Sequence, residues 1–304
     1  MDGTELRLVV GTAAAGTRLD RFLAEPIGSR AQAQALIDAG AVSVDGRRVP
    51  KRHALAAGEI VEVATREVGP APAPERDPAP FAVAWEDEHL IVVDKPAGVV
   101  VHPARGHWTG TLAQALAGRA AGGEDATRAG IVHRLDRDTS GLLVVARSET
   151  VHRALKAQLA ARELRREYLA LVDGHPQART GTIEAPVGRD RRDRTLMSID
   201  TDEPREARTH FEIERLLPEA ALLRVVLDTG RTHQIRVHLA AIGTPVAGDP
   251  QYGGPGGPRY GLTRQFLHAA RLAFTHPVTG EAIDVRSDLP PDLAAALQRA
   301  VDGG

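Results

Sequence analysis

The chain has 304 residues and a formal net charge of −2, so its total charge does not mark it as a nucleic-acid-binding protein. Hydrophobic residues make up 42%, enough for an ordinary soluble core, and the absence of cysteine excludes disulfides, zinc–thiolate sites and a cysteine nucleophile. The N-terminus lacks the order of a signal peptide, and no apolar run approaches the ~20 residues of a membrane span. These features favour a cytoplasmic protein without a membrane partner.

The segment GPAPAPERDPAP, residues 69–80, divides the chain into two unequal parts. Proline at nearly every second position favours an extended, semi-rigid spacer that cannot build a packed core. We therefore predict a small domain over residues 1–68, a linker over 69–80 and a large domain over 81–304.

The small domain reads as two helices followed by a hairpin. Apolar residues recur at helical spacing over residues 18–26, and a second helix is predicted over 28–40. Over 41–49, Asp45-Gly46 lies between alternating valines, which is a strong signal for a two-residue hairpin turn. Arginines at the helix start and the turn could be a solvated charged face, or could present donors to phosphate. These arginines are Arg30, Arg47 and Arg48.

This small domain resembles the S-four-type RNA-binding domain of ribosomal proteins. The resemblance is carried by R-L-D-R-F-L, S-R-x-x-A-x-x-L-I-x-x-G and V-x-V-D-G-R-R-V, over about residues 16–65. It implies RNA binding through Arg30, Arg47 and Arg48. Ala31 and Gln32 stand where the family often has serine or lysine, which implies weaker phosphate contacts there.

The large domain mixes strands and helices without regular helical crossovers. Apolar and alternating runs predict strands at 89–96, 142–147, 167–174, 209–216 and 220–228. Helical spacing predicts helices at 111–120, 149–163, 232–243 and 290–301. Because strands follow one another directly, we predict an α+β fold with a mostly antiparallel sheet flanked by helices.

The most polar stretch of the chain, H-R-L-D-R-D-T-S-G over residues 133–141, lies between two apolar runs. Its spacing permits three interpretations. Asp136 and Asp138 could be a pair of glycosidase carboxylates, although such groups usually come from separate elements. Together with His133 they could bind magnesium or manganese. The stretch could also be an exposed loop whose charges pair locally.

A resemblance that spans residues 82–290 bears on this choice. The chain is similar to the RluA/RluD family of pseudouridine synthases in the segments 92–103, 130–146, 165–174, 227–254 and 267–277, which occur in the family order. Examples are V-V-D-K-P-A-G, H-R-L-D-R-D-T-S-G and T-G-R-T-H-Q-I-R. The resemblance implies isomerisation of uridine to its C-glycoside within RNA, with no cofactor, no metal, no redox change and no hydrolysis.

The resemblance also implies roles for individual residues. Asp136 is the catalytic aspartate, Arg236 is the cation that keeps it ionised, and Tyr168 stacks on the target uracil. Arg134 fills the space left by the flipped nucleotide, while the RNA-contacting or supporting residues Arg231 and His233 complete the site. The chemical route stays open between attack at ribose carbon 1′, proton removal at carbon 2′ through a glycal, and addition to uracil carbon 6.

The form of the late motifs resembles the RluD kind of enzyme, which implies large-subunit ribosomal RNA as substrate. No additional apolar stripe stands out, so we predict a monomer. The sequence is also compatible with two other functions. One is a non-catalytic RNA-binding or ribosome-assembly factor on the same fold, and the other is a metal-dependent hydrolase using His133, Asp136 and Asp138.

Overall fold

The computed structural model describes residues 4–27, 30–65, 79–103, 109–123, 130–254 and 259–303. Backbone contacts divide the chain into two compact units, Met1–Glu75 and Arg76–Gly304. The predicted linker at 69–80 lies almost entirely outside the described residues, so the domain boundaries at 68 and 81 stay a prediction. Within the described ranges, none of the helices has the length and apolar character needed to span a bilayer.

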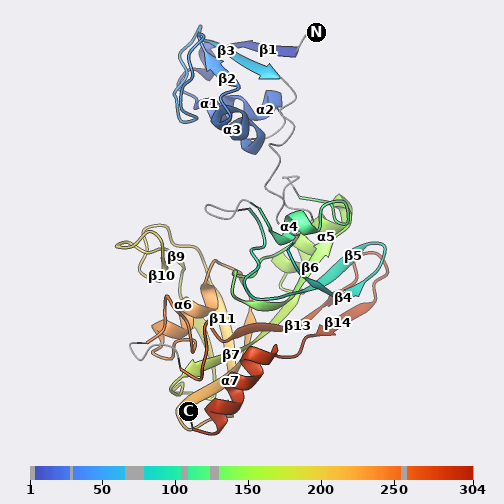
Figure 1. The fold of residues 1–304 in the computed structure, drawn as a ribbon, viewed down its shortest axis with the longest axis vertical. Helices are drawn as coiled ribbons and strands as arrows, with labels where there is room; N and C mark the ends of the chain where they lie inside the picture. The colour runs from blue at the N-terminus through green and yellow to red at the C-terminus, as the bar shows by residue number, and fades with distance from the viewer. Residues whose placement is uncertain are drawn as a thin grey trace. The chain divides into compact units, whose positions relative to one another are not determined.

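The N-terminal unit is a three-stranded antiparallel sheet with short helices (Figure 1). The strand order is β1 (Thr4–Val9), β3 (Ile60–Thr65) and β2 (Val42–Val44). The one or two helical turns predicted over 18–26 are found as two short helices, α1 (Leu19–Phe22) and α2 (Ala24–Ile27). The break follows from Pro26, whose ring conflicts with the carbonyl four residues earlier. The second predicted helix is confirmed as α3 (Arg30–Asp38).

The turn at Asp45-Gly46 is confirmed, but the hairpin around it is incomplete. Both residues have positive φ, 48° and 73°, and the backbone of Val44 exchanges hydrogen bonds of 2.8 and 2.9 Å with that of Arg47. This is the geometry of a two-residue hairpin turn. Beyond Arg47 the chain leaves the sheet, and β2 pairs with β3 instead. Long-range pairing with residues 60–65 thus replaces the second arm of the predicted hairpin.

The second unit is built on one nine-stranded sheet. The order is β4 (Ala82–Glu86), β5 (Leu90–Lys95), β6 (Ser140–Ala146), β13 (Leu267–Thr275), β7 (Arg165–Asp173), β12 (Ala220–Leu227), β11 (Arg208–Leu216) and β8 (Thr180–Glu184), with β14 (Ala282–Arg286) paired to β13. Only the β6–β13 pair is parallel among these strands. The predicted α+β class and the mostly antiparallel sheet are confirmed.

Helices and a small hairpin complete this unit. The helices predicted over 149–163, 232–243 and 290–301 appear as α5 (Glu149–Ala160), α6 (Gln234–Ala241) and α7 (Pro291–Val301), whereas the helix predicted over 111–120 is much shorter, α4 (Leu112–Ala115). The two-stranded sheet of β9 (Gly188–Arg189) and β10 (Met197–Ser198) was not predicted. Helix α7 begins at a proline, which is tolerated because the first helical N–H has no intrahelical partner.

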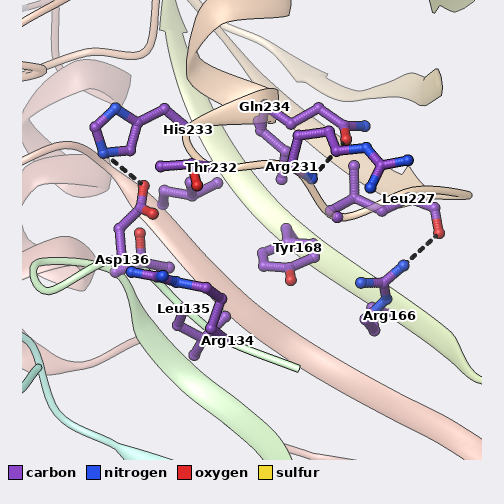
Figure 2. A pocket seen from close by; sticks show the side chains of 14 residues that line it. Arg134, Leu135, Asp136, Arg166, Tyr168, Leu227, Arg231, Thr232, His233 and Gln234 are labelled. Atoms are coloured by element: carbon purple, nitrogen blue, oxygen red, sulfur yellow. Dashed lines mark hydrogen bonds and ion pairs between the residues drawn. The ribbon is translucent and has the colours of Figure 1, made fainter. Parts of the chain in front are cut away.

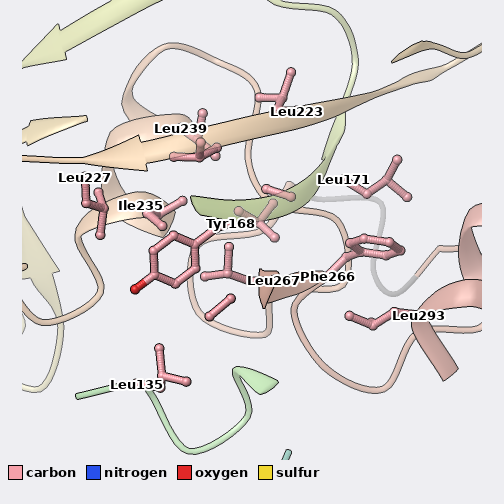
Figure 3. Close-up of a cluster of buried hydrophobic side chains, with 14 of the residues drawn as sticks. Leu135, Tyr168, Leu171, Leu223, Leu227, Ile235, Leu239, Phe266, Leu267 and Leu293 are labelled. Carbon is pink, nitrogen blue, oxygen red and sulfur yellow. The ribbon is translucent and has the colours of Figure 1, made fainter. Parts of the chain in front are cut away.

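The main core packs α6 and α7 against the sheet. Ile235 and Leu239 of α6, Leu293 of α7 and Phe266 belong to one cluster of buried side chains (Figure 3). Tyr168 of β7 lies in this cluster with its hydroxyl oxygen pointing out of it (Figure 3). Packing in this cluster therefore fixes the ring of Tyr168 at the edge of a pocket, with its hydroxyl directed out of the core.

Candidate active site

A pocket opens where the loop before β6, strand β7 and the loop before α6 meet. Asp136, Tyr168, Arg134, Arg231 and His233 all line it (Figure 2). The other lining residues are Leu135, Thr139, Arg166, Leu227, Gly230, Thr232, Gln234, Ile235 and Leu267. The structure thus brings together side chains mainly from three separate parts of the sequence, around residues 134–139, 166–168 and 227–235. The remaining predicted residues are Arg236, described next, and the three arginines of the N-terminal unit.

Asp136 is held by a buried arginine. Nη1 of Arg236 donates to Oδ2 of Asp136 at 3.2 Å, while its Nε and Nη2 donate to the two carboxylate oxygens of Asp249 at 2.6 and 2.8 Å. Nη2 also donates to Gln251 at 2.9 Å, and the guanidinium carbon lies 4.9 Å from the ring centre of Tyr252. The arginine is therefore fixed from behind and directs one donor at Asp136.

This arginine stays charged despite its burial. Burial lowers the pKa of Arg236, but its hydrogen bonds and attraction to Asp249 and Asp136 outweigh burial and raise the pKa above its usual value. The Asp136–Arg236 pair was expected from the resemblance, whereas the contacts of Asp249, Gln251 and Tyr252 were not predicted. These three residues lie in the G-D-P-Q-Y-G-G stretch of the segment 227–254, which is part of that resemblance.

His233 adjoins the same carboxylate. Its Nε2 lies 4.0 Å from Oδ2 of Asp136, and its Nδ1 lies 2.9 Å from the hydroxyl of Tyr252, which also accepts the N–H of Met197 at 2.9 Å. Its backbone is left-handed, with φ of 55°, which is unusual for a residue other than glycine and is tolerated mainly at functional sites. Burial lowers the pKa of His233 although Asp136 opposes this, so the imidazole is neutral at pH 7.

Tyr168 stands at the centre of the sheet, paired with Val225 of β12 and Ala269 of β13. Burial raises the pKa of its phenol, so the group remains protonated. Arg134 is exposed, and Nε of Arg231 donates to the carbonyl of Glu206 at 2.9 Å. Of these two arginines only Arg134 has a side chain that lies mainly in solvent.

The loop that carries Asp136 is tied down through its backbone. Lys95 is fully buried, and its Nζ donates to the carbonyls of Pro96, Val99 and Arg137 at 2.8, 3.0 and 2.9 Å. Arg264 donates to the carbonyl of Asp138 at 2.9 Å. Burial lowers the pKa of Lys95 to about 7. These contacts hold the loop rigid, as a precise site requires.

His133 and Asp138 serve this loop in other ways. Nε2 of His133 accepts the N–H of Val144 at 3.4 Å, and Asp138 pairs with Arg137 at 2.8 Å. Among the described residues, no three acidic or histidine side chains are arranged to hold a metal ion. The metal-site interpretation of His133, Asp136 and Asp138 therefore has no geometric support in this part of the chain.

The buried His133 predicts a specific pH dependence of stability. Burial lowers its pKa to about 3, whereas an unfolded histidine titrates near ~6.5. Between these values only the unfolded chain binds the proton, so stability is lost as the pH falls from 6.5 towards 3. Between pH 7 and 5 this loss is about 2 kcal/mol.

Urea unfolding of the wild type and His133→Gln at both pH values measures this contribution. The glutamine can still accept the N–H of Val144, and the pH-dependent loss should shrink by about 2 kcal/mol. The control His152→Gln, on helix α5, should keep the wild-type loss. An unchanged pH dependence in His133→Gln would mean that the folded protein protonates this imidazole.

Comparison with known proteins shows the family to which the chain belongs. The family model described as RNA pseudouridylate synthase matches residues 89–241, and the model of the S4 domain matches residues 17–61. A relative from Nitrosomonas europaea, named ribosomal large subunit pseudouridine synthase D, is 42% identical, and the match covers 96% of this chain and 87% of the relative. An uncharacterized RNA pseudouridine synthase from Chloroflexus aurantiacus is 46% identical over 99% of this chain and 96% of its own length.

A solved structure supports the same family. Human RNA pseudouridylate synthase domain containing 1 is similar with a TM-score of 0.57 and 27% identity, over 74% of this chain and 96% of that one. The expected resemblance is confirmed in both parts of the chain. Its motifs, its sheet and its relatives agree, and the chain belongs to the RNA pseudouridylate synthase family of isomerases, with an S4 domain at its N-terminus.

Proposed function

We propose that this enzyme isomerises uridine in large-subunit ribosomal RNA and that Asp136 is its catalytic residue. The ion pair between Asp136 and the buried Arg236, at the mouth of a pocket that also contains Tyr168, is the observation that carries the proposal. Relatives from Nitrosomonas europaea and Xanthomonas campestris, each 42% identical, are named as large-subunit ribosomal enzymes, which supports the substrate.

The geometry suits a single carboxylate that acts on a flipped nucleotide. Arg236 binds Oδ2 of Asp136, which leaves Oδ1 available for the ribose or the base. The aromatic face of Tyr168 can stack on uracil, and Arg134 can take the position that the base leaves in the RNA. Isomerisation conserves the atomic composition and the oxidation level of the nucleotide, so the reaction requires no redox partner.

The N-terminal unit is proposed to hold the RNA. Arg47 and Arg48 are exposed at and beside the Asp45-Gly46 turn, whereas the side chain of Arg30 lies outside the described residues. Replacing both arginines by glutamine should weaken RNA binding about tenfold at 0.1 M salt and lower the slope of log affinity against log salt by about 1 to 2.

Filter binding over a range of salt concentrations tests this role. The matched control is Arg7→Gln, on the same unit, where Arg7 is paired with Glu62 at 3.5 Å. This control should leave the slope unchanged. Equal slopes for the wild type and the Arg47→Gln, Arg48→Gln double variant would contradict the proposed role of the turn.

The substrate is tested with transcripts that carry tritium at uracil carbon 5. Isomerisation releases this tritium because carbon 5 forms the new bond to ribose. Release from large-subunit ribosomal RNA, and none from small-subunit or transfer RNA, is expected. Release from transfer RNA alone would overturn the substrate while leaving the reaction intact.

We further propose that the enzyme is a cytoplasmic monomer. The large apolar side chains that are exposed in the described parts are scattered: Val9, Val83, Ile199, Leu216, Ile242 and Val278. Scattered apolar residues do not form the contiguous patch that a stable interface needs. Sedimentation equilibrium should give the mass of one chain, and a twofold mass would contradict this.

A further inference from the structure

The active-site pocket contains a second buried cation, Arg166, which the roles given so far do not use. Its side chain belongs to β7, and the residue is only 5% exposed. Its Nη2 donates to the carbonyl of Leu227 at 3.3 Å (Figure 2), and its buried Nε has no partner among the described residues. Within the same ranges it forms no ion pair with a carboxylate, unlike Arg236.

Strand geometry explains why the adjacent carboxylate does not neutralise this charge. Side chains alternate between the two faces of a strand, so Arg166 and Tyr168 share the pocket face. Glu167 points to the opposite face, where it pairs with Arg165 and Arg271 at 3.2 and 2.7 Å. The sequence R-R-E-Y therefore places an unpaired guanidinium beside the catalytic aromatic ring.

The loop before α6 passes close to this guanidinium. A Cβ added to Gly230 would lie 2.7 Å from Nη1 of Arg166, the far end of that side chain. Burial lowers the pKa of Arg166, while Tyr168 and Asp228 raise it in part. A guanidinium nevertheless stays protonated in proteins. Burying a cation without a carboxylate partner is unfavourable, and an anionic group of the substrate can offset this cost.

The reaction itself supplies such a group. In the first two routes the bond between ribose carbon 1′ and N1 breaks, and its electron pair passes to N1 and is shared with both carbonyl oxygens of uracil. In the third route, addition to carbon 6 places the negative charge on carbon 5 and its neighbouring carbonyl oxygen. Uracil therefore becomes negative by every route. Uracil becomes neutral again when its carbon 5 bonds to ribose carbon 1′. Carbon 5 then releases its proton to solvent, and N1 takes up a proton.

Position favours the base over a phosphate as the partner of Arg166. Arg166 and Tyr168 are both buried, whereas a phosphodiester stays with the RNA backbone near exposed donors such as Arg134. We propose that Arg166 is a further catalytic residue: it donates a hydrogen bond to a carbonyl oxygen of uracil and stabilises the charge that uracil gains during isomerisation. This role rests on the proposed function of Asp136.

Single-turnover kinetics at saturating enzyme test this role with the RNA that the wild type modifies. Arg166→Gln should lower the rate by about 10²- to 10³-fold, the usual effect of removing one donor to a developing anion, and should change the RNA dissociation constant less than about threefold. The rate of Arg166→Lys should be at least about tenfold higher than that of Arg166→Gln, because lysine keeps a positive charge at this position. The matched control Arg165→Gln, an exposed arginine on the opposite face of the same strand, should keep the wild-type rate.

A second substrate separates charge stabilisation from a structural role. Fluorine at carbon 5 stabilises a uracil anion, so RNA with 5-fluorouridine at the target depends less on Arg166. The loss caused by Arg166→Gln, measured as consumption of the target nucleoside by mass spectrometry, should be about tenfold smaller than with uridine. Equal losses on both substrates, or weaker binding with an unchanged saturated rate, would overturn the role of Arg166 alone. A wild type without turnover on any RNA would overturn the proposed function as well.

Discussion

Replacing Asp136 by asparagine is expected to lower the isomerisation rate by at least about 10⁴-fold, the scale of losing an essential nucleophile or base. Asparagine keeps the shape of the side chain, and its side-chain oxygen can still accept from Nη1 of Arg236. The neutral amide can neither attack carbon 1′ nor remove a proton. Single-turnover kinetics give the rate, and filter binding should show an RNA dissociation constant that changes less than about threefold.

Asp138 provides the matched control, because it lies in the same loop and pairs with Arg137. Asp138→Asn should reduce the rate by less than about tenfold, since it removes one partly exposed ion pair. Comparable losses in the two variants would mean that the loop contributes through its structure. Unfolding of Asp136→Asn, detected by circular dichroism, would likewise contradict a purely chemical role.

Replacing Arg236 by methionine is expected to have the second large effect, on both activity and stability. Among the described residues Asp136 loses its only cationic donor within 3.5 Å, and the rate should fall by about 10²- to 10³-fold. The same change leaves the fully buried carboxylate of Asp249 without its arginine. Such a break in a buried pair costs about 3–5 kcal/mol of unfolding free energy.

A double variant separates the two effects. In Arg236→Met with Asp249→Asn, the buried position carries no charge, so urea unfolding should recover at least about 2 kcal/mol of the lost stability. The isomerisation rate should stay low because Asp136 still lacks its cation. Recovery of the rate together with the stability would show that Arg236 acts only by maintaining the fold.

The local patterns of the sequence predicted most helices and the buried strands of the larger unit. Alternation and helical spacing are properties of neighbouring residues, so β5, β7, β12, α5 and α7 could be identified from them. In the N-terminal unit the same approach found the turn at Asp45-Gly46 but not its partner strands. The pairing of β2 with β3 joins residues about 20 positions apart, which no local pattern records.

The site was predictable only in part for a similar reason. Asp136, Tyr168 and Arg236 came from the family resemblance, because spacing alone could not decide between a metal site, a carboxylate pair and a loop. Asp249 and Lys95 were missed because their roles depend on burial and on contacts across the fold. The sequence also did not predict that Arg166 lacks a carboxylate partner among the described residues. Glu167 is its neighbour in the sequence, but the side chain of Glu167 lies on the other face of the sheet.

Tritium release tests the central claim, that this chain isomerises uridine through Asp136, most directly. Large-subunit ribosomal RNA labelled at uracil carbon 5 would be incubated with the wild type and with Asp136→Asn, both in EDTA. We expect stoichiometric release by the wild type and none above background by the variant. Release by Asp136→Asn at the wild-type rate, or release by the wild type that disappears in EDTA and returns with a divalent ion on prefolded RNA, would contradict the account.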